Sequence, residues 1–284
     1  MRRREVIGGL LAVHLAGNSI ARFSHAADRA PLLLGVTTST DNSGLLDHLL
    51  QAFHEAHGIE IRAITAGTGA ILNMASRGDV SAVLVHAPDD EKAFVAAGYG
   101  IDRRPVMRNR YVVVGPTSDP AGIADKTNAA DAFAAIAQNG ALFLSRGDES
   151  GTHKAEQRLW KAADVELGTE PSQNIWYRES GSGQGSTLNI AVNLRAYCLT
   201  DEATWATFQN RGDLVTLFDR DDQLMDNLYS IILVNPERFP KVNHAGALMF
   251  ADWLSSEAGQ ATISSFKING KRLFRNGPDK QLAG

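Results

Sequence analysis

Apolar and polar residues follow two kinds of pattern that alternate along most of this chain. Residues 82–85 form a continuous apolar run of strand length, and residues 59–64 alternate apolar and polar side chains as a half-buried strand does. Residues 43–56 instead place leucines three and four positions apart, which is the spacing of one helical face. Strand and helix patterns in alternation predict an α/β fold.

The expected elements form two consecutive sets. The first set has strands at 31–36, 59–64, 82–85 and 111–114, and helices at 43–56, at 70–76 and through Phe94. The second set has helices at 129–138, after Thr152 and at 187–197, and strands at 141–144, 174–177 and 214–218. A strand at 229–234 and a helix at 245–266 are then expected to return the chain to the first set.

Two extended crossings between these sets predict two lobes joined by a hinge. Lobe I is expected to comprise residues 27–115 and 230–284, and lobe II residues 116–229. The roughly 258 residues that follow position 26 suffice for two lobes of ordinary domain size.

The first 26 residues have the features of an export signal. Residues 2–4 are arginines, the apolar stretch that follows is too short to span a membrane, and residues 24–26 resemble a cleavage site. We therefore expect a signal peptide at 1–26 and a periplasmic protein, with Arg3 and Arg4 favouring the twin-arginine route. Cys198 is the only cysteine and lies far from the cleavage point, which excludes a lipoprotein and an intrachain disulfide.

The net charge limits the possible partners. The formal charge is −4, and removal of residues 1–26, which carry four Arg and one Glu, lowers it to −7. An acidic chain without a basic stripe argues against nucleic acid as a partner. Any anion site must then be built from local groups. We expect a monomer.

Four polar stretches rich in Gly, Ser and Thr lie between a strand-like run and a helix start. They are residues 37–40, 67–69, 145–152 and 180–186. In open α/β sheets, ligands bind where strand ends meet helix N-termini, whose free N–H groups and positive dipole end attract anions. Two stretches fall in each expected lobe, so together they predict a ligand cleft between the lobes.

The chemistry of these stretches favours a small oxyanion. Hydroxyl and backbone donors outnumber acceptors, and Arg146 adds a planar, permanently charged fork. The strand end at 85–87 offers no acid that would accept a proton from a protonated anion, which favours a fully ionised one. Taken alone, residues 145–152 are equally compatible with an ordinary capped turn.

At this point the sequence resembles a known family, the periplasmic tungstate-binding proteins of ABC importers (TupA), which have the two-lobe, type II solute-binding fold. The resemblance covers nearly the whole mature chain. The motifs that carry it are residues 37–40, 66–69, 84–88, 113–116, 145–152, 176–177, 181–188 and 234–236. Residues 145–152 are also similar to the arginine-serine-glycine-threonine loop of phosphate-binding proteins.

The resemblance implies a bound oxyanion, tungstate or molybdate, without a cofactor or any metal other than that of the oxyanion. The expected binding residues are Thr38, Ser39, Thr68, Gly69, Arg146, Ser150, Gly151 and Thr152. The residues expected to support them are Thr37, Thr40, His86, Gly183 and Gln184, although His86 is also compatible with an ordinary packed histidine. The implied partners are an ABC transporter permease and its ATPase.

Three positions depart from the family pattern. Ser39-Thr40 stands where the family usually has Thr-Ser, Gln184 where methionine is expected, and Glu202 where arginine is expected. The first two departures affect the expected pocket, whereas the third leaves the fold expectation intact.

Two alternatives remain. One is a phosphate- or sulfate-binding protein of the same fold. The other is an exported phosphatase- or esterase-like enzyme, with Asp148 and Glu149 as acid–base candidates. The chain has no G-x-S-x-G string, and residues 147–152 lack the spacing and lysine of a P-loop. We therefore expect a binding protein and not an enzyme.

Overall fold

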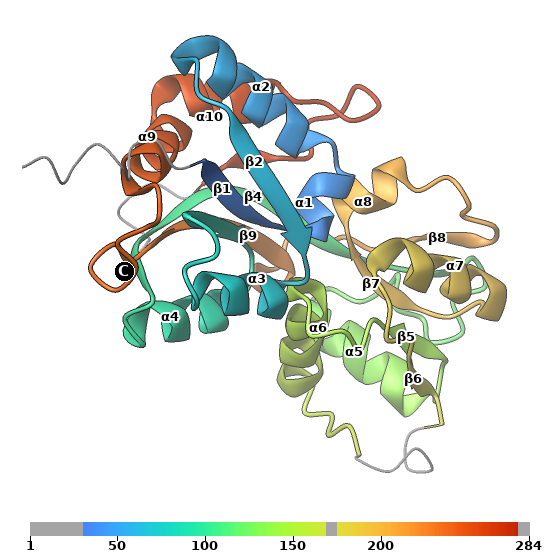
Figure 1. The fold of residues 1–284 in the computed structure, drawn as a ribbon. Coiled ribbons are helices and arrows are strands. Elements are labelled where there is room, and N and C mark those ends of the chain that lie inside the picture. Colours follow the sequence, from blue (N-terminus) through green and yellow to red (C-terminus); the bar gives the residue numbers. More distant parts are fainter. Residues whose placement is uncertain (1–30, 169–174, 278–284) are drawn as a thin grey trace, which may run out of the picture.

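The computed structural model describes residues 31–168 and 175–277, which form two α/β lobes (Figure 1). The expected signal peptide at 1–26 lies outside the described residues. Among the described residues, no helix is both long and apolar enough to cross a membrane.

Lobe I is built on a sheet with the strand order β10-β4-β9-β3-β1-β2. Strand β1 lies parallel between β2 and β3, whereas β9 runs antiparallel to both β3 and β4. The bounds of these strands are β1 Leu32–Thr37, β2 Ile61–Ala66, β3 Ala82–Val85, β4 Gly100–Pro116, β9 Asp226–Val234 and β10 Arg275–Asn276.

Helices cover both faces of this sheet (Figure 1). One face packs against α2 (Leu45–His57), α9 (His244–Ser255) and α10 (Glu257–Ser265), in a core that includes Leu34, Phe53 and Phe250. The other face packs against α3 (Thr68–Ala75) and α4 (Pro88–Ala96) through Ile71, Val83 and Phe94. The short helix α1 (Thr38–Asn42) follows β1 directly.

Lobe II is organised around the second half of β4. Residues Tyr111 to Pro116 pair with β7 (Cys198–Asp201) and β8 (Leu214–Phe218), and β5 (Phe143–Ser145) pairs with β6 (Tyr177–Glu179). The Leu144 N–H group donates to the Tyr197 carbonyl, and the Tyr197 N–H group donates to the Leu142 carbonyl, which connects β5 to the β7 side. The helices of this lobe are α5 Ala129–Gln138, α6 Gly151–Ala162, α7 Gln184–Leu194 and α8 Glu202–Thr207, with a 3-10 turn at Gln223–Met225.

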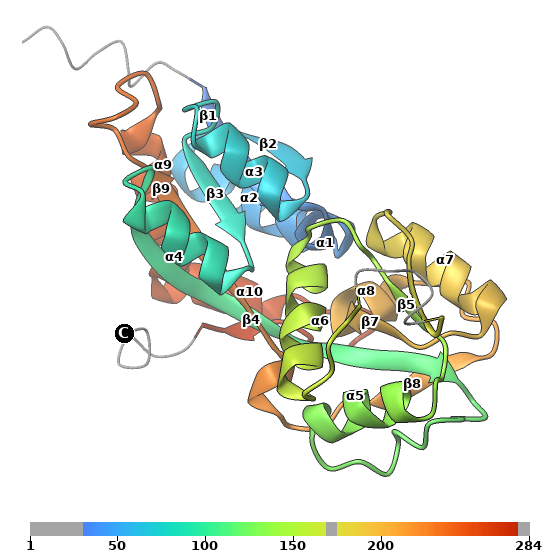
Figure 2. The same cartoon turned by 90° about the horizontal axis from the view of Figure 1, so that it is seen from below.

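Strand β4 belongs to both lobes (Figure 2). It pairs with β9 as far as Arg110, opposite Asp226, and from Tyr111 onward it pairs with β7. The two chain crossings therefore lie side by side at the start of β9 and the middle of β4. This pairing favours a hinge near Arg110 and Asp226, whereas the expected lobe ranges, with boundaries at 115 and 230, stay a prediction.

Four expected elements differ from the structure. The strand expected at 174–177 is β6, which covers Tyr177–Glu179, and residue 174 lies outside the described residues. The helix expected at 187–197 is α7, which starts at Gln184 and ends where Arg195 adopts a left-handed backbone conformation. The helix expected at 245–266 is two helices, because Ser256 leaves helical geometry and its hydroxyl caps α10. The strand expected at 111–114 is the end of the 17-residue strand β4. Its first half carries Asp102, Arg103 and Arg104, whose charges hide the strand pattern.

Candidate functional site

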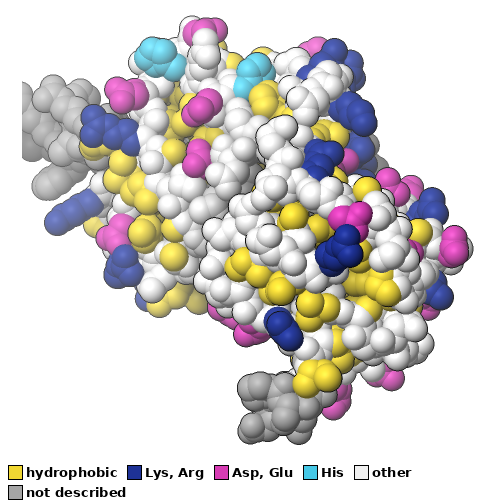
Figure 3. Space-filling model, turned by 90° about the vertical axis from the view of Figure 1, so that its right-hand side faces the viewer, with side chains coloured by type: hydrophobic (Ala, Val, Ile, Leu, Met, Phe, Trp, Pro, Cys, Tyr) yellow, Lys and Arg dark blue, Asp and Glu magenta, His cyan; other side chains and the backbone are white. Residues whose placement is uncertain are grey.

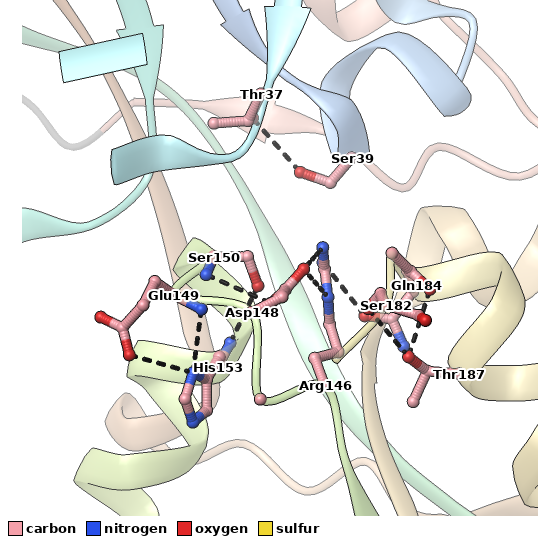
Figure 4. A network of polar contacts seen from close by, with 12 residues as sticks. Thr37, Ser39, Arg146, Asp148, Glu149, Ser150, His153, Ser182, Gln184 and Thr187 are labelled. Carbon is pink, nitrogen blue, oxygen red and sulfur yellow. Dashed lines mark hydrogen bonds and ion pairs between the residues drawn. The ribbon is translucent and has the colours of Figure 1, made fainter. Parts of the chain in front are cut away.

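Three of the four polar stretches meet at the contact between the two lobes, because His86 contacts both Ser39 and Gly151, and Arg146 contacts Gln184. Residues 37–40 and 67–69 lead into α1 and α3 of lobe I, and residues 145–152 and 180–186 lead into α6 and α7 of lobe II. Figure 4 shows Thr37 and Ser39 facing Arg146, Asp148 and Gln184 across this contact.

The loop before α6 has a backbone shape that needs glycine. Gly147 adopts φ +60°, and a Cβ atom there would lie 2.7 Å from the Cβ of Glu179. Ser150 caps α6, since its hydroxyl accepts a hydrogen bond from the His153 N–H group. The expected capped turn is therefore present, and it holds Arg146 within the lobe contact.

Arg146 is buried with only 3% of its surface exposed. Its Nε and Nη2 atoms donate to one carboxylate oxygen of Asp148, at 3.1 and 2.5 Å, and Nη1 lies 3.5 Å from the Gln184 side-chain oxygen. A buried charge requires such partners because desolvation of an isolated charge is costly. Asp148 thus positions Arg146, a role different from the acid–base function considered from the sequence.

Two buried threonine hydroxyls lie at helix starts of opposite lobes. Thr68 is fully buried at the first turn of α3, and its hydroxyl oxygen has no hydrogen-bond partner among the described residues. Thr152 is equally buried in the first turn of α6. Its hydroxyl lies close enough to the Tyr111 hydroxyl to affect that group's ionisation, but it is outside hydrogen-bonding geometry. An unsatisfied buried hydroxyl costs about 1–3 kcal/mol, so the Thr68 hydroxyl favours a partner from outside the chain, and the Thr152 hydroxyl favours one in addition to its Tyr111 neighbour.

The hydroxyls that follow β1 form a connected group. Thr37 Oγ1 lies 3.3 Å from Ser39 Oγ and 3.1 Å from Thr40 Oγ1, and all three side chains are buried. Thr38 is the partly exposed member of this stretch. The structure therefore brings Ser39 to the lobe contact with Thr37 and Thr40 behind it.

His86 follows β3, and its buried ring has hydrogen-bond partners at both nitrogens. Its Nε2 atom lies 2.9 Å from Ser39 Oγ, and its Nδ1 atom lies 2.8 Å from Asn227 Oδ1. Burial lowers the pKa of His86 to about 3; the nearby Arg146 and Arg158 charges act in the same direction, while the bond to Asn227 opposes them. The ring is therefore neutral near pH 7.

Direct contacts join the lobes around this ring. Gly151 packs against His86 so closely that an added Cβ atom would lie 2.6 Å from the ring carbon Cε1. The Tyr111 hydroxyl of lobe II, which donates to the Gly151 carbonyl of the same lobe at 3.4 Å, also lies 3.2 Å from Nδ1 of His86 in lobe I. On α6, Lys154 Nζ forms an ion pair with Asp90 of α4 at 3.0 Å.

The remaining expected residues have different surroundings. Gly69 and Gly183 are exposed, and a Cβ atom at either position would have no neighbouring atom within 4 Å. Gln184 is buried and donates from its side-chain nitrogen to the Leu199 carbonyl at 3.1 Å, so it connects Arg146 to β7. Glu202 pairs with Arg275 at 3.1 Å, away from these stretches.

The structure also brings in residues that the sequence patterns do not reveal. Asn109, Asn227 and Tyr111 lie on the two crossing strands and contact His86 directly or through one another. They have no motif, and they are identified only by the pairing of Asn109 with Asn227 across β4 and β9 and by the contact of Tyr111 with His86.

Three further features of the described residues are a surface of mixed charge, a buried cysteine and a cavity. Acidic and basic side chains are interspersed on the face that Figure 3 shows. Among residues 31–168 and 175–277, no group of three or more His, Cys, Asp or Glu side chains is placed to hold a metal ion. Cys198 is buried, which raises the pKa of its thiol. A cavity of about 500 Å³ lies beside Arg110, Trp205 and Lys271, and Thr68, Arg146 and Thr152 do not line it.

Comparisons with known proteins agree with this architecture. Residues 24–258 match the family model of the PBP superfamily domain. The chain is 36% identical over 240 residues to the tungstate-binding protein TupA of Peptoclostridium acidaminophilum, a match that covers 84% of this chain and 82% of that protein.

Two solved structures are similar over most of their length. The tungstate-binding protein TupA of Desulfovibrio alaskensis G20 is 44% identical with a TM-score of 0.75, covering 88% of this chain and 100% of that one. The tungstate ABC transporter structure from Geobacter sulfurreducens is 42% identical with a TM-score of 0.75, covering 83% and 98%. The expected two-lobe periplasmic-binding-protein fold is thereby confirmed, and the chain belongs to the PBP superfamily and, within it, to the TupA family.

Proposed function

We propose that this protein binds a tetrahedral oxyanion, tungstate in the first place and molybdate as the close competitor, between its two lobes. The observation that carries the proposal is the pair of buried hydroxyls, Thr68 and Thr152, at helix starts of opposite lobes, together with the buried Arg146 in the loop before α6. The relatives' names supply the choice of tungstate.

The donor set suits a small, fully ionised anion. Thr68 and Thr152 can donate hydrogen bonds from their hydroxyls, and the first turns of α3 and α6 can donate from backbone N–H groups. Arg146 can donate from the guanidinium N–H groups that do not bond to Asp148. A hydrogen bond to a charged group contributes about 1.5–3 kcal/mol. Because donors come from both lobes, the anion would stabilise the contact between them.

The proposed role is the substrate-binding component of an ABC importer. The protein would be exported by its signal peptide at 1–26, capture the anion in the periplasm as a monomer, and deliver it to a membrane permease with its ATPase. The ligand would be the transported solute, without a cofactor, and the protein would have no enzymatic activity of its own. The family membership and the names of the relatives support this role.

Calorimetric titration of residues 27–284 with tungstate, molybdate, sulfate and phosphate tests the proposal. We expect stoichiometric binding of tungstate, with sulfate and phosphate much weaker. Preference for phosphate or sulfate would replace tungstate by that anion, and failure to bind any of the four would refute the oxyanion site.

A matched pair of variants tests the two-lobe donor set. Thr68→Val keeps the side-chain shape and removes the unpartnered hydroxyl, so it should weaken tungstate binding about tenfold to one hundredfold. Thr262→Val removes a hydroxyl that bonds only to the Ala258 carbonyl of α10, and it should leave the affinity unchanged. Equal affinities for the two variants would show that Thr68 does not contact the anion.

A further inference from the structure

A continuous series of buried hydrogen bonds connects lobe II to the Ser39 hydroxyl through the hinge. Asn109 on β4 and Asn227 on β9 are register partners at the point where both strands cross between the lobes, and both are fully buried. The series runs Asp201–Asn109 (2.9 Å), Asn109–Asn227 (2.7 Å), Asn227–His86 (2.8 Å) and His86–Ser39 (2.9 Å).

Asp201 sets the direction of the first two bonds. Its Oδ1 atom caps α8 by accepting from the N–H groups of Ala203 and Thr204, at 3.1 and 3.0 Å. Backbone N–H groups cannot reverse, so Oδ1 is an acceptor and the Asn109 amide must present its NH₂ group. The Asn109 oxygen then faces Asn227, which must present its own NH₂ group in turn. In this way the network assigns both amide orientations.

The same reasoning assigns the proton of His86. With its NH₂ group facing Asn109, Asn227 presents its oxygen to His86 Nδ1, so Nδ1 must carry the hydrogen. Tyr111 is compatible with this assignment, since its hydroxyl can donate to the Gly151 carbonyl at 3.4 Å while it accepts from Nδ1 at 3.2 Å. A neutral ring that is protonated at Nδ1 has a lone pair at Nε2. Ser39 is the partner of that lone pair and must donate to it.

We propose that Asp201, Asn109 and Asn227 are positioning residues that, through His86, direct the Ser39 hydroxyl proton to His86 Nε2 and away from the bound ligand. The inference rests on the proposed oxyanion site and changes the role expected for Ser39 within it. The Ser39 side chain then lines the site without donating to the anion, and the anion accepts hydrogen bonds from the hydroxyls of Thr68 and Thr152.

The tautomer of His86 tests the relay without any ligand. In the full mature chain labelled with ¹⁵N-histidine, long-range ¹H–¹⁵N correlation spectra distinguish a protonated Nδ1 from a protonated Nε2 atom. We expect His86 to be protonated at Nδ1. A ring protonated at Nε2 in the wild-type protein would overturn the proposal. This measurement uses the wild-type protein alone, so it does not depend on whether a variant folds.

A remote variant separates a relay from a local contact. Asn109→Leu removes the group that orients Asn227 and does not itself touch His86, so we expect the His86 signals to shift toward the form protonated at Nε2. Tyr229→Phe is the matched control, because the Tyr229 hydroxyl bonds to Asn227 but does not set its orientation. It should retain the Nδ1 form. An unchanged tautomer in a folded Asn109→Leu protein would contradict the relay.

Calorimetry then tests the consequence for the ligand. Ser39→Ala should change the tungstate dissociation constant less than about threefold, whereas Thr68→Val should raise it about tenfold or more. A loss at Ser39→Ala equal to that at Thr68→Val would overturn the assignment of the Ser39 proton. If the wild-type protein binds no oxyanion at all, the proposed function fails, and the tautomer result stands apart from it.

Discussion

The packing of Gly151 against His86 between the lobes predicts an effect of Gly151→Ala on affinity. Gly151 is buried at the start of α6, and an added Cβ atom would lie 2.6 Å from Cε1 and 2.7 Å from Nδ1 of His86. The ring cannot move aside easily, because Ser39 and Asn227 hold it from both sides. The backbone itself accepts alanine, which is the better helix former by about 0.5–1 kcal/mol. The steric contact is therefore the main cost.

The size of this cost follows from its place between the lobes. Overpacking of a tight contact typically costs about 1–3 kcal/mol. Gly151 belongs to lobe II and His86 to lobe I, so a small opening at the hinge relieves the contact without unfolding either lobe. The anion is proposed to bind the state in which Gly151 packs against His86, so this overpacking cost of about 1–3 kcal/mol is subtracted from the binding free energy. The affinity should then be about 5- to 150-fold weaker.

Three measurements decide this prediction. Calorimetry with tungstate should show the weaker affinity, small-angle X-ray scattering of the free protein should show a larger radius of gyration, and thermal unfolding should change little. Gly185→Ala is the control, since a Cβ atom at that position in the first turn of α7 would meet nothing within 4 Å. Wild-type affinity in Gly151→Ala, or a large loss of stability with unchanged affinity, would refute the reasoning.

Three further predictions concern buried ionisable groups. Arg146→Ala should cost about 2–5 kcal/mol of tungstate binding in a calorimetric titration, because it removes the one buried cation of the site and leaves Asp148 without its partner; unchanged affinity would exclude contact with the anion. Burial raises the pKa of Glu156 to about 7, above its value in the unfolded chain, so the folded state stays protonated to a higher pH than the unfolded state. The free energy of unfolding should therefore fall by about 3 kcal/mol as the pH rises from 4.5 to 7. Glu156→Gln should abolish that decrease in urea unfolding, and an unchanged pH dependence would contradict it. The pH dependence due to His86 has the opposite sign, because its pKa is lowered in the folded state: its contribution to the free energy of unfolding is present above pH 6.5 and is lost as the pH falls toward 3. In urea unfolding, His86→Gln should therefore lose less stability than the wild type between pH 7 and acid, and an equal loss would contradict this.

Several features of this protein were determined by local sequence alone. The alternation of apolar runs and helical faces predicted the α/β fold, since periodicity depends only on neighbouring residues. The small polar stretches before helices predicted four loops, and the structure brings those at 37–40, 145–152 and 180–186 together. Ser150 was identifiable as a helix cap and Arg146 as the charge beside it, because capping and spacing are properties of a few consecutive residues. Their role in binding an oxyanion stays a prediction.

The tertiary structure decided the contacts between distant residues. His86 is 47 positions from Ser39 and 141 from Asn227, and no local pattern indicates that they touch. The continuous strand β4 was only partly predicted, since charged residues interrupt its first half and pairing with β9 holds it extended. The same pairing places Asn109 opposite Asn227 at the hinge, and the packing of α6 brings Gly151 against His86. Such contacts depend on how two lobes pack together, which the periodicity of a chain does not encode.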